Sequence, residues 1–213
     1  MNRTRFIIVL TMLAIYLLPL STNAHEDVFV YQRETVCLKE FPVQPALFKD
    51  YVTPYVTQII EKHGLEEWKA VLITNEFHRH LGIWSIVGAK MGIRAREVME
   101  MPFDEIAVVS YAGNKPPYSC LTDGLQVSTG ASLGRGTITV LSHPNEPSAD
   151  FMFKGRKITL KAKPQVVKTI GEIIRDYSGK YGFQSPRYFQ ELDKISVEYW
   201  LKLDRKEIFE EIR

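Results

Sequence analysis

The sequence predicts an α+β protein in which helices pack on an antiparallel or mixed sheet. Two observations predict this class. Segments of helical and strand character follow one another in the order helix, strand, helix, a strand-rich middle and a helical tail. The length of 213 residues, with 45% hydrophobic and 24% charged residues, suits a single globular core domain. We expect this core over about residues 50–165 and the helical tail over residues 166–213.

The first 24 residues have the layout of a cleavable secretory signal. A short basic start at residues 2–5 precedes an apolar run at residues 6–20, and small residues follow up to Ala24. The apolar run is short for a stable membrane span, so an uncleaved anchor is the weaker alternative. With no cysteine near the cleavage point, a lipoprotein is disfavoured. We therefore expect residues 25–213 to form a periplasmic or secreted protein without a membrane span.

Charge and cysteine content exclude several classes of function. Loss of Arg3 and Arg5 with the signal leaves 25 basic residues from 27, which equals the 25 acidic residues. A neutral protein lacks the basic surface that nucleic acid requires. Cys37 and Cys120 allow one disulfide but no disulfide framework, and without a Cys-x-x-Cys pair a structural zinc finger has no basis.

The mature chain begins with a segment of β character, residues 27–41, which predicts a short strand or an extended arm. Apolar residues at helical spacing then predict a helix over residues 47–63. Pro54 falls inside this pattern, so the helix either begins near this proline or is kinked by it. Gly64 is expected to end the helix in a left-handed conformation.

Two histidines lie before the most regular helical pattern of the chain. The apolar run at residues 68–74 either enters the sheet or extends the approach to residues 75–82, which we expect to be a strand-to-helix junction. Residues 83–99 are helical in pattern throughout. Gly88 and Gly92 are four residues apart on this helix, which lets a second backbone approach closely.

The second half of the chain alternates strands and helices before the helical tail. Strands are predicted at residues 105–112, 137–141, 150–153 and 157–160, the last two joined as a hairpin. Helices are predicted at residues 119–128, 166–177 and 186–203. Ser119 is the expected N-cap of the first of these. A last short helix is expected after Asp204, with Glu207 in the capping-box position.

The pair His78 and His80 is the first candidate for chemistry. In an extended segment, residues two apart point to the same side, so both rings can bind one metal ion or flank one planar ligand. Neutral imidazole is the commonest side-chain ligand of zinc, copper, nickel and iron. The alternative is that one ring caps the next helix while the other is solvated.

Cys120 and Asp123 are the second candidate, because residues three apart share one face of a helix. The helix dipole favours a thiolate in the first turn, where it serves as a soft ligand or a nucleophile. The alternatives are a buried, inert thiol and a disulfide with Cys37. The glycine-rich segment 129–137 lacks the spacing, the lysine and the following helix of a phosphate-binding loop, although it can bring Arg135 near a ligand.

These segments resemble the FmdE family, the FmdE-like domain of formylmethanofuran dehydrogenase. Residues 77–82, followed by Gly88 and residues 91–92, are similar to its opening motif, approximately Phe-His-Gly-His-x-Cys-Pro-Gly before a helix with a Gly and a Met-Gly. Residues 120–126, with the turn at 129–136, match its Cys-x-x-Asp-Gly-x-Gln helix and the following Thr-Gly and Gly-rich turn. The resemblance implies an α+β core, commonly dimeric, with a crevice where the two motifs meet.

This chain departs from the family pattern at two places. Gly82 stands where the family has a cysteine, and Ile83 stands where it has a proline. One thiolate is therefore missing from the expected cluster, which leaves His78, His80 and Cys120. The C-terminal zinc module of some members is also missing, since no cysteine follows Cys120.

Together, the motifs predict a binding crevice for a small molecule or a metallocofactor in a homodimer. The expected ligand is a zinc, iron or nickel ion, or a haem-like tetrapyrrole for which the loss of the cysteine leaves space. His78, His80 and Cys120 are the predicted metal ligands; Asp123, Gln126 and Arg135 are expected to contact the cofactor, with Arg135 neutralising an acidic group. Two alternatives remain open. One is an enzyme in which His78 and His80 are catalytic, for example in removing a metal from a macrocycle, and the other is a metal-free binding module.

Overall fold

The structure is a computed structural model that describes residues 37–213. The expected signal peptide and most of the predicted arm at residues 27–41 lie outside the described residues. Within residues 37–213, no helix is both long and apolar enough to cross a membrane.

The described residues form six α-helices and a five-stranded mixed sheet, which confirms the predicted α+β class. The helices are α1 (Val56–His63), α2 (Leu65–His78), α3 (Ile83–Met99), α4 (Cys120–Thr129), α5 (Pro164–Tyr181) and α6 (Pro186–Lys202), with 3-10 turns η1 (Pro45–Leu47) and η2 (Thr53–Tyr55) before them. The strands are β1 (Ala107–Ser110), β2 (Ile138–Val140), β3 (Ser148–Phe153), β4 (Arg156–Ala162) and β5 (Phe209–Ile212).

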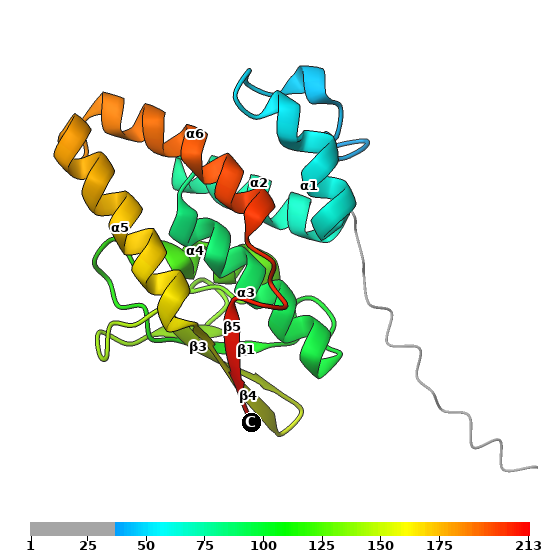
Figure 1. The fold of residues 1–213 in the computed structure, drawn as a ribbon. Helices are drawn as coiled ribbons and strands as arrows, with labels where there is room; N and C mark the ends of the chain where they lie inside the picture. The colour runs from blue at the N-terminus through cyan, green and yellow to red at the C-terminus, as the bar shows by residue number, and fades with distance from the viewer. Residues whose placement is uncertain (1–36) are drawn as a thin grey trace, which may run out of the picture. The chain divides into compact units, whose positions relative to one another are not determined.

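The sheet has the strand order β2-β1-β3-β4-β5, in which only β1 and β2 pair in parallel. The predicted hairpin is confirmed as β3 and β4, which are joined through Lys154 and Gly155. Figure 1 shows the helices stacked on one side of this sheet. On the opposite side, Asp150 is only 5% exposed, and its buried carboxylate accepts hydrogen bonds from the hydroxyls of Tyr111 (2.7 Å) and Thr159 (2.6 Å).

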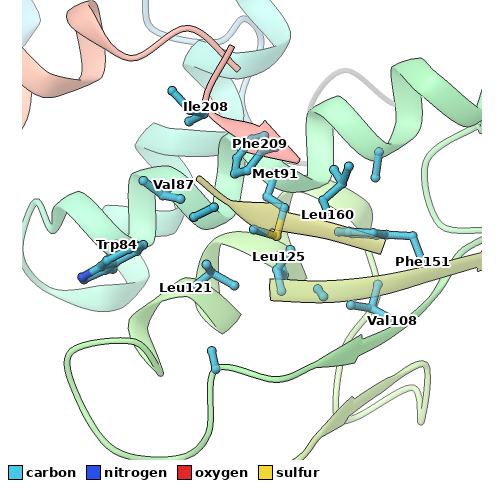
Figure 2. Close-up of a cluster of buried hydrophobic side chains, with 14 of the residues drawn as sticks. Trp84, Val87, Met91, Val108, Leu121, Leu125, Phe151, Leu160, Ile208 and Phe209 are labelled. Atoms are coloured by element: carbon cyan, nitrogen blue, oxygen red, sulfur yellow. The ribbon is translucent and has the colours of Figure 1, made fainter. Parts of the chain in front are cut away.

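The core lies between the sheet and the pair α3 and α4. Alternate residues of the strands point into it, among them Val108, Phe151 and Leu160, and they meet Met91 of α3 and Leu125 of α4 (Figure 2). All five side chains are at most 1% exposed. Burial of these side chains therefore stabilises the layer that holds α3 and α4 in place.

Two glycines allow the backbones of α3 and α4 to touch. A Cβ atom on Gly88 would lie 2.0 Å from the carbonyl oxygen of Leu121, and one on Gly124 would lie 2.2 Å from the amide nitrogen of Ala89. The close approach predicted for Gly88 is thus confirmed, with α4 as the second backbone. This contact fixes the first turn of α4, which begins at Cys120, beside the first turns of α3.

Three local predictions are wrong. Residues 68–74 are part of α2 rather than a strand, since Trp68, Val71 and Asn75 are buried at helical spacing along one face. The segment after Asp204 forms a turn and then β5 rather than a helix, because it pairs with β4. Ser119 makes no side-chain capping hydrogen bond at the start of α4.

The other predicted helices are present, although α1 begins later than predicted, at Val56, and α5 (Pro164–Tyr181) extends beyond the predicted residues 166–177 at both ends. The helix over residues 83–99 is α3. Near Pro54, the first of the two alternatives holds, because the proline lies in η2 and the regular helix α1 begins two residues later. Gly64 ends α1 as predicted, but with φ of 86° and ψ of 161° it does not adopt the predicted left-handed helical conformation.

Candidate functional site

The two histidines lie where α2 ends and α3 begins. His78 is the last residue of α2, and Arg79 ends the helix in a left-handed conformation with φ of 70°. His80 follows in the connection, and Gly82 is the N-cap residue of α3. The predicted strand-to-helix junction is therefore wrong, because two helices meet here and His78 and His80 do not lie in an extended segment.

Polar contacts hold this connection in a single conformation. Asn75 Oδ1, inside α2, accepts hydrogen bonds from the Gly82 N–H (3.1 Å) and from the Ser85 hydroxyl (2.7 Å). Asp193 of α6 accepts a hydrogen bond from the Leu81 N–H at 2.8 Å. Since these acceptors come from rigid helices, the loop presents its side chains with little freedom.

The rings of His78 and His80 converge although the segment is not extended. Their centroids are 4.3 Å apart, with an angle of 40° between the ring planes. A Cβ atom on Gly82 would lie 3.2 Å from His80 Nε2 and 3.5 Å from His78 Nε2. Both Nε2 atoms thus face the same small space, which the missing side chain of Gly82 leaves open.

Asp123 of α4 orients the first of these rings. His78 Nδ1 lies 2.7 Å from Asp123 Oδ2, a distance typical of a charge-assisted hydrogen bond in which the ring N–H donates to the carboxylate. His78 Nε2 is buried and has no hydrogen-bond partner among residues 37–213. A buried ring nitrogen without a partner is costly unless a ligand or water satisfies it.

The two histidines have opposite pKa shifts. Burial lowers the pKa of His78, but the hydrogen bond with Asp123 and the neighbouring Cys120 thiol outweigh this effect and raise it to about 9. Burial lowers the pKa of His80 to about 4, and the positive charge of His78 adds to the decrease. At neutral pH, the His78 ring is therefore protonated on both nitrogens and positively charged, whereas the His80 ring is neutral.

A cavity of about 180 Å³ opens beside the histidines. His78, His80, Gly82 and Cys120 line one part of it, and apolar side chains of α3, α5 and α6 line much of the rest. Cys120 is half-buried and Cys37 is exposed. Both thiols are free, and no disulfide joins them in the described chain. The cavity joins two imidazoles and a thiol to a largely apolar chamber.

Four of the predicted site residues come together, namely His78, His80, Cys120 and Asp123. Gln126 instead accepts a hydrogen bond from the Leu133 N–H (3.3 Å) and lines a separate hollow that also contains Asp123. Arg135 pairs with Asp104 at 2.6 Å and donates to the Gly130 carbonyl oxygen, and it is not one of the residues that line the cavity.

Sequence reasoning missed the aromatic residues of the cavity. The ring of Phe189, on α6, lies 5.0 Å from the ring of His80, and Trp84 forms part of the wall next to the histidines. Trp84 lies only four residues after His80, and this closeness in the sequence could have indicated that it lines the same cavity. Phe189 gave none, because α6 is remote in the sequence and its aromatic residues match an ordinary packing face.

Within residues 37–213, no group of three or more His, Cys, Asp or Glu side chains is arranged to hold a metal ion. The convergent nitrogens are a pair, His78 Nε2 and His80 Nε2. Coordination of a metal here requires a further ligand from solvent, from a bound molecule or from a moved side chain such as Cys120.

Comparison with known proteins gives a family match over the site and most of the sheet. The sequence model of the family described as "FmdE, Molybdenum formylmethanofuran dehydrogenase operon" matches residues 77–210, more than half of the chain. Among solved structures, the chain is similar to a tungsten formylmethanofuran dehydrogenase FmdE-like protein from Syntrophus aciditrophicus. The identity is 18%, the match covers 81% of this chain and 76% of that chain, and the TM-score is 0.37. Comparison with curated proteins gave no match.

Proposed function

We propose that this chain, which belongs to the FmdE family, binds a transition-metal ion through the Nε2 atoms of His78 and His80. The family is associated with a metal-containing enzyme system, since its description refers to the operon of a molybdenum formylmethanofuran dehydrogenase. This association supports a metal-related role in general. The identity of the ion and its ligands is our proposal.

The observation that carries the proposal is the convergence of two imidazole nitrogens on the space beside Gly82. A metal-binding histidine usually donates its other ring N–H to a carboxylate, which fixes the ring and its tautomer. His78 has this arrangement, with Nδ1 held by Asp123 and Nε2 buried without a partner among the described residues. An ion at this point would satisfy that nitrogen, and it would displace the proton that His78 Nε2 carries at neutral pH.

The donor set suits zinc, iron or nickel, for which imidazole and thiolate are good ligands. Two imidazoles with Cys120 or solvent as a further ligand would leave an open coordination position, as in catalytic rather than structural sites. A bound ion would supply Lewis acidity. In this arrangement His78 and His80 hold the ion, Asp123 orients His78, and the apolar wall limits the access of water.

The size of the cavity favours an ion over a haem-like tetrapyrrole. Pockets for drug-sized ligands have volumes of roughly 300–1,000 Å³, whereas this cavity measures about 180 Å³. A macrocycle would therefore require α5 and α6 to move away from the histidines. Haem remains one of the ligands to be tested.

An enzymatic role is the second candidate, and the opposite pKa shifts of the two histidines favour it. Neighbouring titratable groups whose pKa values are pushed apart commonly act as an acid and a base. Near neutral pH, His80 is the neutral ring that would accept a proton, and His78 is the protonated ring that would donate one. Asp123 would keep the charge on His78. This role requires no metal.

The test is to purify the mature protein without added metal and to measure its metal content by mass spectrometry. The wild type and a control variant, His143→Ala, are expected to contain about one zinc, iron or nickel ion per chain, because His143 is exposed and remote in sequence from the site. The double variant His78→Ala/His80→Ala is expected to contain none. Equal metal content in all three proteins, or none in the wild type, would overturn the proposal.

The visible spectrum of the same samples, recorded with and without haem, tests the tetrapyrrole. A shifted haem absorption band in the wild type that is lost in His78→Ala/His80→Ala would identify haem as the ligand in place of the ion. A spectrum equal to that of free haem would exclude it.

We also propose that the signal is cleaved after Ala24, that the mature chain is periplasmic or secreted, and that it forms a homodimer. The composition of the first 24 residues supports the first two points. The intact mass of the exported protein tests the cleavage, and sedimentation equilibrium tests the dimer. A retained signal or a monomer at micromolar concentration would contradict these points.

A further inference from the structure

We infer that His63 is the acid-sensitive residue of a clamp between α1 and the C-terminal end of α6, and that its protonation in mildly acidic solution loosens the clamp. The clamp consists of four buried or largely buried side chains, those of His63, Glu67, Lys90 and Arg205. None of these four lines the cavity of the candidate site. The clamp nevertheless anchors α6, the helix that carries Phe189 of the cavity wall.

The ring of His63 bridges three helices. His63 is the last residue of α1 and is 3% exposed. Its Nε2 atom lies 3.0 Å from the carbonyl oxygen of Leu201, in the last turn of α6, and its Nδ1 atom lies 3.8 Å from Glu67 Oε1 in α2. Because a carbonyl oxygen can only accept, Nε2 carries the ring proton in the neutral form, and Nδ1 is the atom that a second proton would occupy.

The carboxylate nearest to Nδ1 already has a cation on each oxygen. Lys90 of α3 is fully buried, and its Nζ atom lies 2.5 Å from Glu67 Oε1. Arg205, after α6, donates to Glu67 Oε2 at 3.0 Å and to the carbonyl oxygen of His63 at 2.8 Å. A proton on His63 Nδ1 would therefore add a third cation to a carboxylate whose two oxygens are paired. A buried charge without a partner of its own is costly, so protonation opposes the closed clamp.

The charges around the clamp balance while His63 is neutral. Among the described residues they are three cations and three anions, namely Lys62, Lys90 and Arg205 against Glu67, Glu97 and Asp204. Protonation of His63 would leave one positive charge in excess among these side chains. In agreement, burial and the charge of Lys90 lower the pKa of His63 below 6.5, although Glu67 opposes them.

The clamp should weaken as the pH falls below 6.5. Because the pKa of His63 is lowered in the closed clamp, the opened chain binds a proton below pH 6.5 that the closed clamp does not. The attachment of α1 to α6 is fully present above this pH, and the opening equilibrium increases by up to about tenfold per pH unit below it. The pKa of Lys90 is about 8 in the folded chain and 10.5 ordinarily, so its effect on stability lies in a separate pH range.

The test is amide hydrogen exchange of the mature protein at about pH 7.5 and about pH 5, expressed as protection factors that correct for the intrinsic effect of pH on exchange. We expect the protection factors of α1 and of residues 201–205 to fall in the wild type, by up to about tenfold for each pH unit below 6.5. His63→Gln keeps an N–H group for the Leu201 carbonyl oxygen but cannot gain a proton. Its protection factors should therefore differ little between the two pH values.

His143→Gln is the matched control, because His143 is exposed, and it should lose protection as the wild type does. Lys90→Met frees Glu67 Oε1 for a protonated His63 and should therefore reduce the loss. Unchanged protection of α1 in the wild type would overturn the inference even if His63→Gln did not fold. An equal loss of protection in the wild type and His63→Gln would overturn it as well, because the acid-sensitive group would then lie elsewhere.

Discussion

At the scale of single residues, the site depends on what surrounds two similar rings. His78 and His80 are both largely buried, yet only His78 has a carboxylate partner, and this difference separates their pKa values. The same carboxylate leaves Nε2 as the free nitrogen of His78. Asp123 therefore controls both the charge of the His78 ring and the direction in which its Nε2 atom points.

Replacing Asp123 by asparagine tests this control. Because the carboxylate supports the protonated ring, Asp123→Asn should lower the pKa of His78 from about 9, as followed by NMR titration of the ring protons. Loss of the carboxylate behind a metal-binding histidine typically costs 10–100-fold in metal affinity, to be measured with zinc. Asp104→Asn, which removes an exposed carboxylate, is the control and should change neither value.

Gly82 offers a test of the convergence itself. Its φ of −97° and ψ of 138° are extended and open to any residue. A Cβ there would lie within 3.5 Å of both Nε2 atoms, and Ser85 Oγ at 3.1 Å and His80 Nε2 at 3.2 Å must shift by a few tenths of an ångström to admit it. Gly82→Cys should therefore add a thiolate ligand, tighten zinc binding and give a sulfur-to-metal absorption band with cobalt(II). Gly82→Ser, of nearly the same size, should show no such band. A cobalt spectrum for Gly82→Cys without the band would count against the geometry.

At the scale of elements, the site depends on how closely α3 and α4 approach each other. Gly124 and Gly88 leave no space for a side chain, because the facing atoms belong to backbone. This contact brings Asp123 of α4 within hydrogen-bond distance of His78 at the end of α2. The site is thus assembled by helix packing, with little contribution from the sheet strands.

The glycine contact predicts a large difference between two glycine-to-alanine substitutions. Gly124→Ala should destabilise the protein by about 1–3 kcal/mol or more, since overpacking forces the helices apart. Gly179→Ala, in α5 with no atom within 4 Å of its Cβ position, should stabilise the protein by about 0.5–1 kcal/mol through its higher helix propensity. Urea denaturation measures both. Equal effects of the two substitutions would contradict the proposed contact.

Elements with a clear local period were predictable from the sequence. The boundaries of α3 agree with its apolar spacing, and the β3–β4 hairpin agrees with the Lys154-Gly155 turn. The strand β5 was not predictable, because its pairing with β4 joins residues about fifty positions apart. For α2, the run of β-branched and apolar residues at 68–74 hid a helical burial pattern that only the packing reveals.

The site itself was predictable only in part. The motifs identified His78, His80, Cys120 and Asp123, which lie together in the structure. The two histidines were expected to converge because they lie in an extended segment, but His78 is the last residue of a helix. The position of Arg135 depends on Asp104, a partner that no local pattern indicates. The apolar wall comes from α5 and α6, whose sequence features are those of any amphipathic helix.

At the scale of the whole described chain, a buried ionic cluster ties distant segments together. Glu67 of α2 is fully buried and pairs with Lys90 of α3 at 2.5 Å and with Arg205, after α6, at 3.0 Å. Arg205 also donates to the His63 carbonyl oxygen at the end of α1. Removing one member of such a cluster leaves an uncompensated buried charge, so it enforces the arrangement of these helices.

Stability should depend on pH through Lys90. Burial lowers its pKa from 10.5 to about 8, although Glu67 opposes the change. Between these two pH values the unfolded chain holds a proton on Lys90 that the folded chain has released. The contribution of Lys90 to the free energy of unfolding should therefore rise from pH 8 to pH 10.5 and stay constant below pH 8.

Lys90→Met isolates this effect. In urea denaturation at about pH 7.5 and about pH 9.5, the wild type should gain stability relative to Lys90→Met as the pH increases. Lys62→Met, at an exposed lysine of α1, should follow the wild type. A difference between wild type and Lys90→Met that does not change with pH would contradict the lowered pKa.

The central claim is that two imidazole nitrogens converge on one metal ion, and calorimetric titration of zinc into metal-free protein tests it most directly. We predict one ion per chain for the wild type and for His143→Ala. For either single variant, His78→Ala or His80→Ala, we predict a loss of affinity of at least about tenfold, since each removes one of two ligands. Unchanged zinc affinity in both single variants would contradict the claim.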